Sequence, residues 1–297
     1  MAINLIDGKR IAEKINRETG QKTLDLKRHG VTPGLAVVLV GSDPASITYV
    51  RRKDKTSQEL GFHSRKIELP AETTEGELLG IVQKLNADSE IHGILVQSPL
   101  PEHINDLKVT FALNPAKDVD GFHPVNVGKL AMGDPSALVP CTPQGCQRLL
   151  LETGVKIEGS RAVILGRSML VGKPLALLLM AKAPGGDATV TVAHSRSYDL
   201  PTICSSADIL VAAMGQPAFV KANYVREGAV VIDVGTTWVR DSSRPKGVRL
   251  TGDVAFDEVA PKTSAITPVP GGVGPMTIAM LMQNTLKACQ YQTGLFV

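Results

Sequence analysis

The chain has 297 residues, of which 43% are apolar and 21% are charged, a balance typical of folded globular proteins and unlike that of disordered or fibrous chains. At this length we expect two hydrophobic cores and therefore two domains. The formal net charge is only +3 and aromatic residues make up 4%, so the composition argues against a nucleic-acid-binding protein but suits small anionic ligands.

The sequence shows no membrane, export or metal signal. Its longest apolar run, Leu175–Ala181, is far shorter than the ~20 residues that span a bilayer. Charged Asp7 and Lys9 interrupt the region where a signal peptide would be apolar, so we expect a cytoplasmic protein. The four cysteines form no CxxC pair and the six histidines have no ligand spacing, so we expect neither a disulfide framework nor a metal.

Short β-branched runs alternate with amphipathic segments along the chain. We expect strands that are buried on both faces at Leu35–Val40, Gly93–Gln97, Arg161–Leu165, Thr189–Ala193, Asp208–Ala213 and Ala229–Val234. Thr74 and Glu77 have the spacing of a capping box, and Pro275 is expected at the first position of the last helix. The alternation predicts an α/β fold with mostly parallel sheets.

Turn-forming residues mark the expected domain boundaries. The segment from Gly133 to Pro143 is rich in them and separates a first α/β unit from a second. A second crossing is expected near Pro268, before a terminal helix whose apolar face needs a sheet to cover. Periodicity leaves open which of the two sheets this helix covers.

A glycine-containing turn follows the predicted strand Arg161–Leu165. Gly166 opens the turn and Gly172 precedes an apolar helical run, an arrangement that suits a pyrophosphate at a helix N-terminus. Ser168 replaces the second glycine of GxGxxG and one extra residue precedes Gly172, so the motif is a weak variant. An ordinary turn between a strand and a helix explains it equally well.

The next predicted strand ends in His194, Ser195 and Arg196. An NAD site usually offers an acidic residue here to the ribose 2′-hydroxyl, and this chain has none. Basic and hydroxyl groups suit a 2′-phosphate, which Arg167 could also bind, so the sequence favours NADP over NAD. Surface solvation is the simpler interpretation for each arginine taken alone.

In the first unit, Tyr49 and Lys53 are four residues apart and therefore share one face of a predicted helix. Their neighbours Arg51, Arg52 and Lys55 make a solvated basic face the simpler interpretation of the spacing alone.

Gln97 ends a predicted strand at the edge where open α/β sheets bind ligands, so it could reach Lys53. Asp118 and Asp120 add two carboxylates in a loop, for which a simple turn is the alternative.

Five motifs in this order resemble the bifunctional methylenetetrahydrofolate dehydrogenase/methenyltetrahydrofolate cyclohydrolase family. They are the glycine-rich segment Pro270–Ile278, the Tyr49/Lys53 pair, Lys117–Gly121, Cys141–Pro143 and Gly166–Ser168. The resemblance extends from about Leu5 to about Ala288. One position departs from the family pattern, because Ser98 stands where the family usually has leucine.

The resemblance implies a folate-binding catalytic domain formed by residues 1–142 and 270–297. Residues 143–269 would form a Rossmann-type NADP-binding domain, with folate in the cleft between the two. The family is typically a homodimer. The small net charge, few aromatic residues and short apolar runs predict no nucleic-acid or membrane partner.

The resemblance also assigns individual residues. Tyr49 would pack on the folate ring system and Asp120 would hold the pterin by paired hydrogen bonds. The implied folate and catalytic residues are Tyr49, Lys53, Gln97, Pro99 and Asp120. The implied cofactor residues are Gly166, Arg167, Ser168, Ser195 and Thr236. The glycines around Gly272 would let the backbone approach the folate or the nicotinamide closely, with a flexible hinge as the alternative.

The implied reaction is NADP-dependent oxidation of 5,10-methylenetetrahydrofolate to the 5,10-methenyl compound, followed by hydrolysis to 10-formyltetrahydrofolate. Hydride transfer needs alignment but no base, whereas hydrolysis needs a proton shuttle, a role that suits Lys53 beside Gln97. A dehydrogenase of another small substrate, such as a hydroxy acid, and a non-catalytic NADP-binding regulator remain as alternatives.

Overall fold

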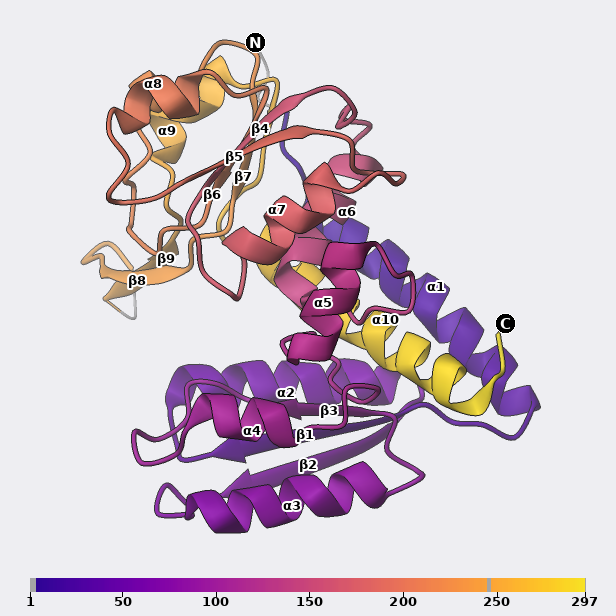
Figure 1. Cartoon of the computed structure of the whole chain (residues 1–297). Coiled ribbons are helices and arrows are strands. Elements are labelled where there is room, and N and C mark those ends of the chain that lie inside the picture. The colour runs from indigo at the N-terminus through magenta and orange to yellow at the C-terminus, as the bar shows by residue number, and fades with distance from the viewer. Residues whose placement is uncertain (1–3, 245–246, 297) are drawn as a thin grey trace. The chain divides into compact units, whose positions relative to one another are not determined.

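The computed structural model describes residues 4–244 and 247–296. It has a two-domain α/β architecture in which both main sheets are parallel, which confirms the predicted fold class (Figure 1). Contacts divide the chain into two compact units. The three-stranded unit comprises Glu13–Cys141 and the chain from Ile278 onward, and the five-stranded unit comprises the residues up to Ala12 and Thr142–Thr277. The helices α1 (Gly8–Arg28) and α10 (Val273–Thr293) contribute residues to both.

The sheet of the three-stranded unit has the order β2-β1-β3, and both pairings are parallel. Its elements are β1 (Gly34–Val40), α2 (Pro44–Glu59), β2 (His63–Leu69), α3 (Glu75–Ala87), β3 (Gly93–Val96), α4 (Asp106–Ala112) and α5 (Pro124–Met132). Every residue of β1 is buried because it is the central strand. Ala36, Val38 and Val40 pack with the apolar residues of α3 and α4 on one face of the sheet, and α2 covers the other face (Figure 1).

The capping box at the start of α3 is confirmed. The Thr74 hydroxyl accepts a hydrogen bond from the Glu77 amide at 3.2 Å, and the Glu77 carboxylate accepts one from the Thr74 amide at 2.8 Å. The helix therefore begins where the spacing predicted, since both ends of the motif satisfy amides that have no partner within the helix.

The five-stranded sheet has the order β10-β7-β6-β4-β5, again with parallel pairings throughout. Its elements are α6 (Cys141–Glu152), β4 (Arg161–Leu165), α7 (Gly172–Met180), β5 (Thr189–Ala193), α8 (Leu200–Ser205), β6 (Ile209–Ala212), η1 (Ala222–Tyr224), β7 (Val230–Asp233), α9 (Phe256–Val259), η2 (Ala260–Lys262) and β10 (Ala265–Ile266). An antiparallel hairpin of β8 (Thr237–Arg240) and β9 (Val248–Thr251) follows β7. The strand order reverses direction at β4, so this is a doubly wound sheet whose ligand edge lies where β4 and β6 end.

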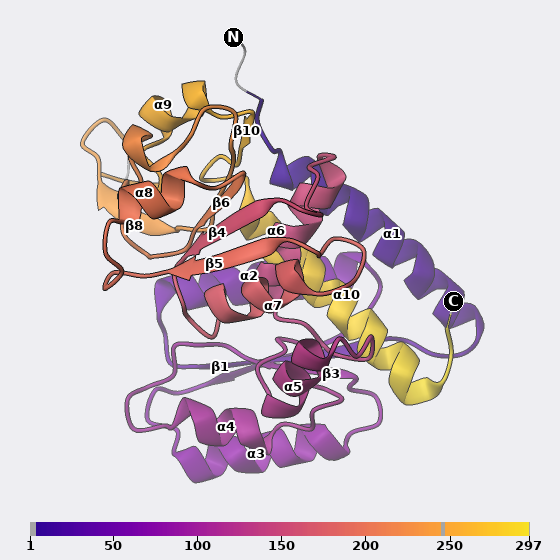
Figure 2. The same cartoon turned by 45° about the horizontal axis from the view of Figure 1, so that its top comes forward.

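Two sequence-based expectations about this sheet and the last helix are wrong. Thr189–Ala193 was expected to be buried on both faces, but it is the edge strand β5 and mostly exposed, with Val192 39% exposed (Figure 2). A strand at the sheet's edge has only one neighbour, so helices cover it incompletely. The last helix begins at Val273, which places Pro275 within its first turn rather than at its first position.

The expected boundary segment Gly133–Pro143 contains the point between Cys141 and Thr142 where contacts divide the chain, but the conformation expected for its last residues is wrong. Cys141–Pro143 was interpreted as the end of a turn-rich linker, but these residues form the first turn of α6. Proline in a first turn loses no helical hydrogen bond, so the segment continues as a helix.

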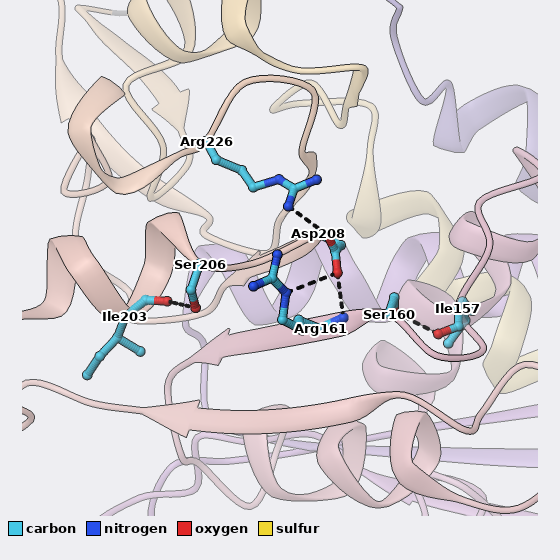
Figure 3. Close-up of polar contacts among 7 residues, drawn as sticks. All are labelled: Ile157, Ser160, Arg161, Ile203, Ser206, Asp208 and Arg226. Carbon is cyan, nitrogen blue, oxygen red and sulfur yellow. Dashed lines mark hydrogen bonds and ion pairs between the residues drawn. The ribbon is translucent and has the colours of Figure 1, made fainter.

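A partly exposed network of a carboxylate and two arginines lies at the opposite, amino end of the five-stranded sheet. Asp208 accepts a hydrogen bond from the Arg161 amide at 2.7 Å and pairs with the Arg226 guanidinium at 2.9 Å (Figure 3). Hydrogen bonds and ion pairs lower the pKa of Asp208, chiefly through the Arg161 amide. The starts of β4 and β6 are therefore joined by one carboxylate.

Among the described residues, no helix is long and apolar enough to cross a membrane.

Candidate functional site

Lys53 lies on the buried face of α2. The helix starts after Asp43, whose side chain accepts a hydrogen bond from the Ser46 amide at 2.7 Å. The buried positions of the helix are Ser46, Val50, Lys53 and Ser57, a spacing of three and four residues. Lys53 is only 7% exposed. The solvated-face interpretation therefore fails for this lysine, although its neighbours on the helix are exposed.

Gln97 meets Lys53 at the carboxyl edge of the three-stranded sheet. The Lys53 Nζ donates a hydrogen bond to Gln97 Oε1 at 2.9 Å, as the sequence predicted. The Gln97 Nε2 in turn donates to the Ser98 carbonyl at 2.6 Å, which fixes the amide orientation. Tyr49 lies one turn earlier on α2 and is 36% exposed, and Pro99 is exposed just beyond Gln97. The structure thus brings the lysine and the glutamine together and leaves Tyr49 and Pro99 accessible.

The loop that carries Asp120 runs beside β3. The Ile94 amide donates to the Lys117 carbonyl at 2.7 Å, and Ile94 forms a parallel bridge with Asp118. Because the loop runs parallel to β3, Asp120 lies at the same carboxyl edge of the sheet as Gln97. Burial raises the pKa of the partly buried Asp120 carboxyl, whereas the positive charge of Lys53 lowers it.

The other two charged residues of this motif are structural. The Lys117 ammonium donates to the carbonyls of Leu85 and Asp88 at 3.2 and 2.7 Å. Asp118 is fully enclosed and accepts hydrogen bonds from the His123 amide at 2.8 Å and from the Asn126 side chain at 2.9 Å. Of the two aspartates singled out in the sequence, only Asp120 faces the lysine.

Two residues that hold this loop had no assigned role in the sequence analysis. The Asn284 side chain, from α10, donates to the carbonyls of Val119 and Val139 at 2.8 Å each. The Cys141 thiol donates to the Val119 carbonyl at 3.4 Å, and burial raises its pKa well above the ordinary value. A polar residue in the apolar face of the last helix is the only signal that could have marked Asn284.

The glycine turn after β4 is tightly packed. Gly166 has φ +137°, and a Cβ there would collide with the Ala213 carbonyl at the end of β6. A Cβ on Gly172 would collide with the Gly166 carbonyl. Neither position accepts a side chain, so the turn holds the start of α7 close to the ends of β4 and β6.

Polar and basic groups surround the start of α7. Val171, the residue before the helix, provides no side-chain cap, while the Ser168 hydroxyl accepts from the Val171 amide at 3.1 Å. Arg167 and Ser168 are exposed. The Lys173 amide donates to the Ser168 carbonyl at 3.0 Å and Pro174 has no amide hydrogen, so α7 offers mainly the positive end of its dipole. This nine-residue helix start beside Arg167 suits an anionic group such as a pyrophosphate.

The turn after β5 presents the predicted hydroxyl and basic groups. Ser195 and Arg196 are exposed, whereas the His194 Nδ1 accepts from the Arg196 amide at 3.2 Å and is used within the turn. Thr236, after β7, is exposed as well. Together with Arg167, Ser195 and Arg196 supply donors for a phosphorylated ribose, so the residues present fit NADP.

Gly272 lies in a crowded segment of the five-stranded unit. A Cβ on it would come within 2.7 Å of the Pro268 carbonyl and of the Thr267 Cβ. A Cβ on Gly8, at the start of α1, would collide with the Gly272 carbonyl. Local packing is therefore a sufficient reason for this glycine, and the flexible-hinge interpretation has no support from it.

Comparisons with known proteins agree with the resemblance seen in the sequence. Residues 6–120 match the model of the catalytic domain of tetrahydrofolate dehydrogenase/cyclohydrolase, and residues 140–293 match its NAD(P)-binding domain. The chain is 56% identical over 297 residues to the bifunctional protein FolD of Dehalococcoides mccartyi (strain CBDB1), with 99% of each chain covered. It is 51% identical over 291 residues to FolD of Syntrophobacter fumaroxidans, with 98% of each chain covered.

Solved structures of the same family are also similar to this chain. The bifunctional enzyme FolD from Campylobacter jejuni superposes with a TM-score of 0.92 at 45% identity, covering 98% of this chain and 100% of that one. The Trypanosoma brucei methylenetetrahydrofolate dehydrogenase-cyclohydrolase, complexed with NADP and an inhibitor, gives a TM-score of 0.93 at 42% identity, covering 99% and 100%. The chain therefore belongs to the tetrahydrofolate dehydrogenase/cyclohydrolase family.

Proposed function

We propose that this protein oxidises 5,10-methylenetetrahydrofolate with NADP and then hydrolyses the 5,10-methenyl product to 10-formyltetrahydrofolate. The observation that carries the proposal is the buried Lys53, hydrogen bonded to Gln97 at 2.9 Å and close to Asp120, at the ligand edge of a parallel sheet. Family membership supplies the substrate class.

The folate would bind at this edge. Asp120 would accept paired hydrogen bonds from the pterin, and the accessible Tyr49 would pack on the ring system. Pro99 and Gly272 would line the substrate. In this proposal residues 1–142 and 270–297 form the folate-binding catalytic domain, and residues 143–269 form the NADP-binding domain. This functional division differs from the division by contacts, which groups residues 4–12 and 270–277 with the five-stranded unit.

The cofactor would be held by the glycine turn and the exposed groups around it. Gly166 and Ser168 would place the pyrophosphate at the start of α7, and Arg167 and Ser195 would bind the 2′-phosphate. Thr236 would lie at the nicotinamide end. Bound NADP supplies the hydride acceptor for the oxidation.

The two activities make different demands on the chain's own residues. The oxidation needs orientation, because the nitrogens that flank the methylene carbon stabilise the cation that forms, so Tyr49 and Asp120 would act by aligning the folate. The hydrolysis needs a group that takes a proton from water and returns one to the ring nitrogen. Lys53 is the group that can move a proton there, with Gln97 holding its Nζ in place.

We further propose that the protein works in the cytoplasm as a homodimer. The family resemblance supports the homodimer. The charged Asp7 and Lys9 near the start of the sequence support the cytoplasm, and the four described cysteines, all of which are free, agree with a reducing compartment.

A coupled absorbance assay tests the function. Methylenetetrahydrofolate and NADP should yield NADPH and then 10-formyltetrahydrofolate, and added methenyltetrahydrofolate should be hydrolysed without cofactor. Tight NADP binding without turnover of any folate would instead indicate a non-catalytic regulator.

A further inference from the structure

Two aspartates at the carboxyl edge of the five-stranded sheet have no role in the function described so far. Asp233 is the last residue of β7 and is 3% exposed, and Asp253, just after β9, is fully buried. Burying a carboxylate is unfavourable unless hydrogen bonds compensate, so their partners indicate what they do.

Asp233 binds three backbone amides from two different loops. Its Oδ1 accepts from the amides of Gly235 at 2.9 Å and Asp253 at 2.8 Å, and its Oδ2 accepts from the Val254 amide at 3.0 Å. Both oxygens are therefore in use. Asp233 ties the loop that leads to Thr236 to the chain that returns from the β8–β9 hairpin.

Asp253 extends these contacts to the loop after β6. Its Oδ2 accepts from the amides of Met214 and Gly215, the latter at 2.9 Å. Its Oδ1 is buried and has no hydrogen-bond partner. Burial raises the pKa of both carboxyls, that of Asp233 to about 6.

Glycines pack directly against the two carboxylates. A Cβ on Gly252 would collide with Asp233 Oδ2, and a Cβ on Gly235 would collide with Asp253 Oδ1. The loop that Asp253 holds begins at Ala213, whose carbonyl abuts Gly166 of the glycine turn. The loops after β4, β6 and β7 are therefore connected through these contacts.

We propose that Asp233 and Asp253, together the carboxylate brace, are positioning residues that hold the loops after β6 and β7 in the conformation that binds NADP. The brace acts through backbone amides and through Thr236, and being buried it does not touch the cofactor. This inference rests on the proposed function, because the proposed function assigns those loops to NADP binding.

The two aspartates respond differently to the same conservative change. In Asp253→Asn the carboxamide oxygen can still accept from Met214 and Gly215, while the NH2 group takes the place of the unpartnered Oδ1. In Asp233→Asn an NH2 group must face at least one backbone amide, because both oxygens accept. We expect the dissociation constant of NADP to rise about tenfold in D233N and to change little in D253N.

Asp253→Ala removes the acceptor altogether and should resemble D233N. Asp208→Ala is the matched control, because Asp208 also binds a backbone amide of this sheet but at the opposite edge. It should lower the melting temperature and leave the NADP dissociation constant unchanged.

Amide hydrogen exchange of the cofactor-free protein provides a second readout. In D233N the amides of Gly235 and Val254 should lose protection, because Asp233 binds them. In D253A the amides of Met214 and Gly215 should lose protection for the same reason. All four amides should keep their protection in D253N and D208A. If wild type fails to bind NADP, the proposed function fails while the exchange data still test the brace.

The proposal would be overturned if D233N, D253N and wild type had equal dissociation constants for NADP. It would also be overturned if D208A weakened NADP binding as much as D253A does. Should D253A fail to fold, D233N and D253N still decide the matter through binding and exchange.

Discussion

The two candidate ligand edges are built differently, although both lie at the carboxyl ends of parallel strands. In the three-stranded unit, side chains converge: Lys53 is buried and hydrogen bonded to Gln97, and its charge acts on Asp120. In the five-stranded unit, glycines shape the backbone, Arg167 and Ser195 are exposed, and the buried Asp233 and Asp253 bind backbone amides. The first edge is suited to moving protons and the second to holding an anion, so substitutions should affect them unequally.

The largest effect should come from Lys53→Met, which keeps much of the apolar stem and removes the amine. Cyclohydrolase activity should fall by about 10²–10⁴-fold, the range for loss of a positioned acid–base group, while dehydrogenase activity remains measurable. Methenyltetrahydrofolate should accumulate and be visible by its absorbance. Lys55→Met is the control, because Lys55 is exposed on the same helix and forms an ion pair with Glu59. If K53M hydrolysed methenyltetrahydrofolate at the wild-type rate, Lys53 would not be the group that moves the proton.

Asp120→Asn and Asp118→Asn should separate ligand binding from structure within one loop. Loss of a charged acceptor should raise the KM for methylenetetrahydrofolate by about tenfold to a hundredfold in D120N, with little change in the melting temperature. D118N should mainly lower the melting temperature, because the enclosed Asp118 holds the His123 amide and the Asn126 side chain. The reverse pattern would contradict the assignment of the two carboxylates.

A smaller effect is expected at the other edge. Arg167→Gln should reduce the preference for NADP over NAD by about tenfold, the scale of one charge-assisted hydrogen bond, and leave the rate with saturating NAD unchanged. Arg226→Gln, which removes an arginine from the amino edge of the same sheet, should leave the preference as it is. The ratio of kcat/KM for the two cofactors measures this, and an unchanged ratio in R167Q would remove Arg167 from the 2′-phosphate site.

The smallest effect is expected from Thr74→Ala at the start of α3, on the opposite side of the sheet from α2. Loss of the helix cap should lower the melting temperature by about 2–4 °C without changing either activity. If hydrolysis also fell, the site would depend on the stability of its whole unit rather than on the convergent side chains.

Several features of the fold could be predicted from local sequence. β4 and β5 begin and end where the β-branched runs indicated, and the capping box starts α3 as expected. β2 (His63–Leu69) was not predicted, because Ile67 and Leu69 are its two apolar residues and none of its side chains is fully buried. The short β10 and the β8–β9 hairpin were also missed, since two to four residues give little periodicity.

The sequence by itself determined the alternation of strands and helices, the glycine turn after β4 and the order of motifs that identifies the family. Only the tertiary structure decided that Lys53 is buried among exposed basic neighbours, that Asp118 is structural while Asp120 faces the lysine, and that β5 is an exposed edge. The physical reason is that spacing along the chain defines which residues share a face, whereas burial and hydrogen bonding depend on what packs against that face.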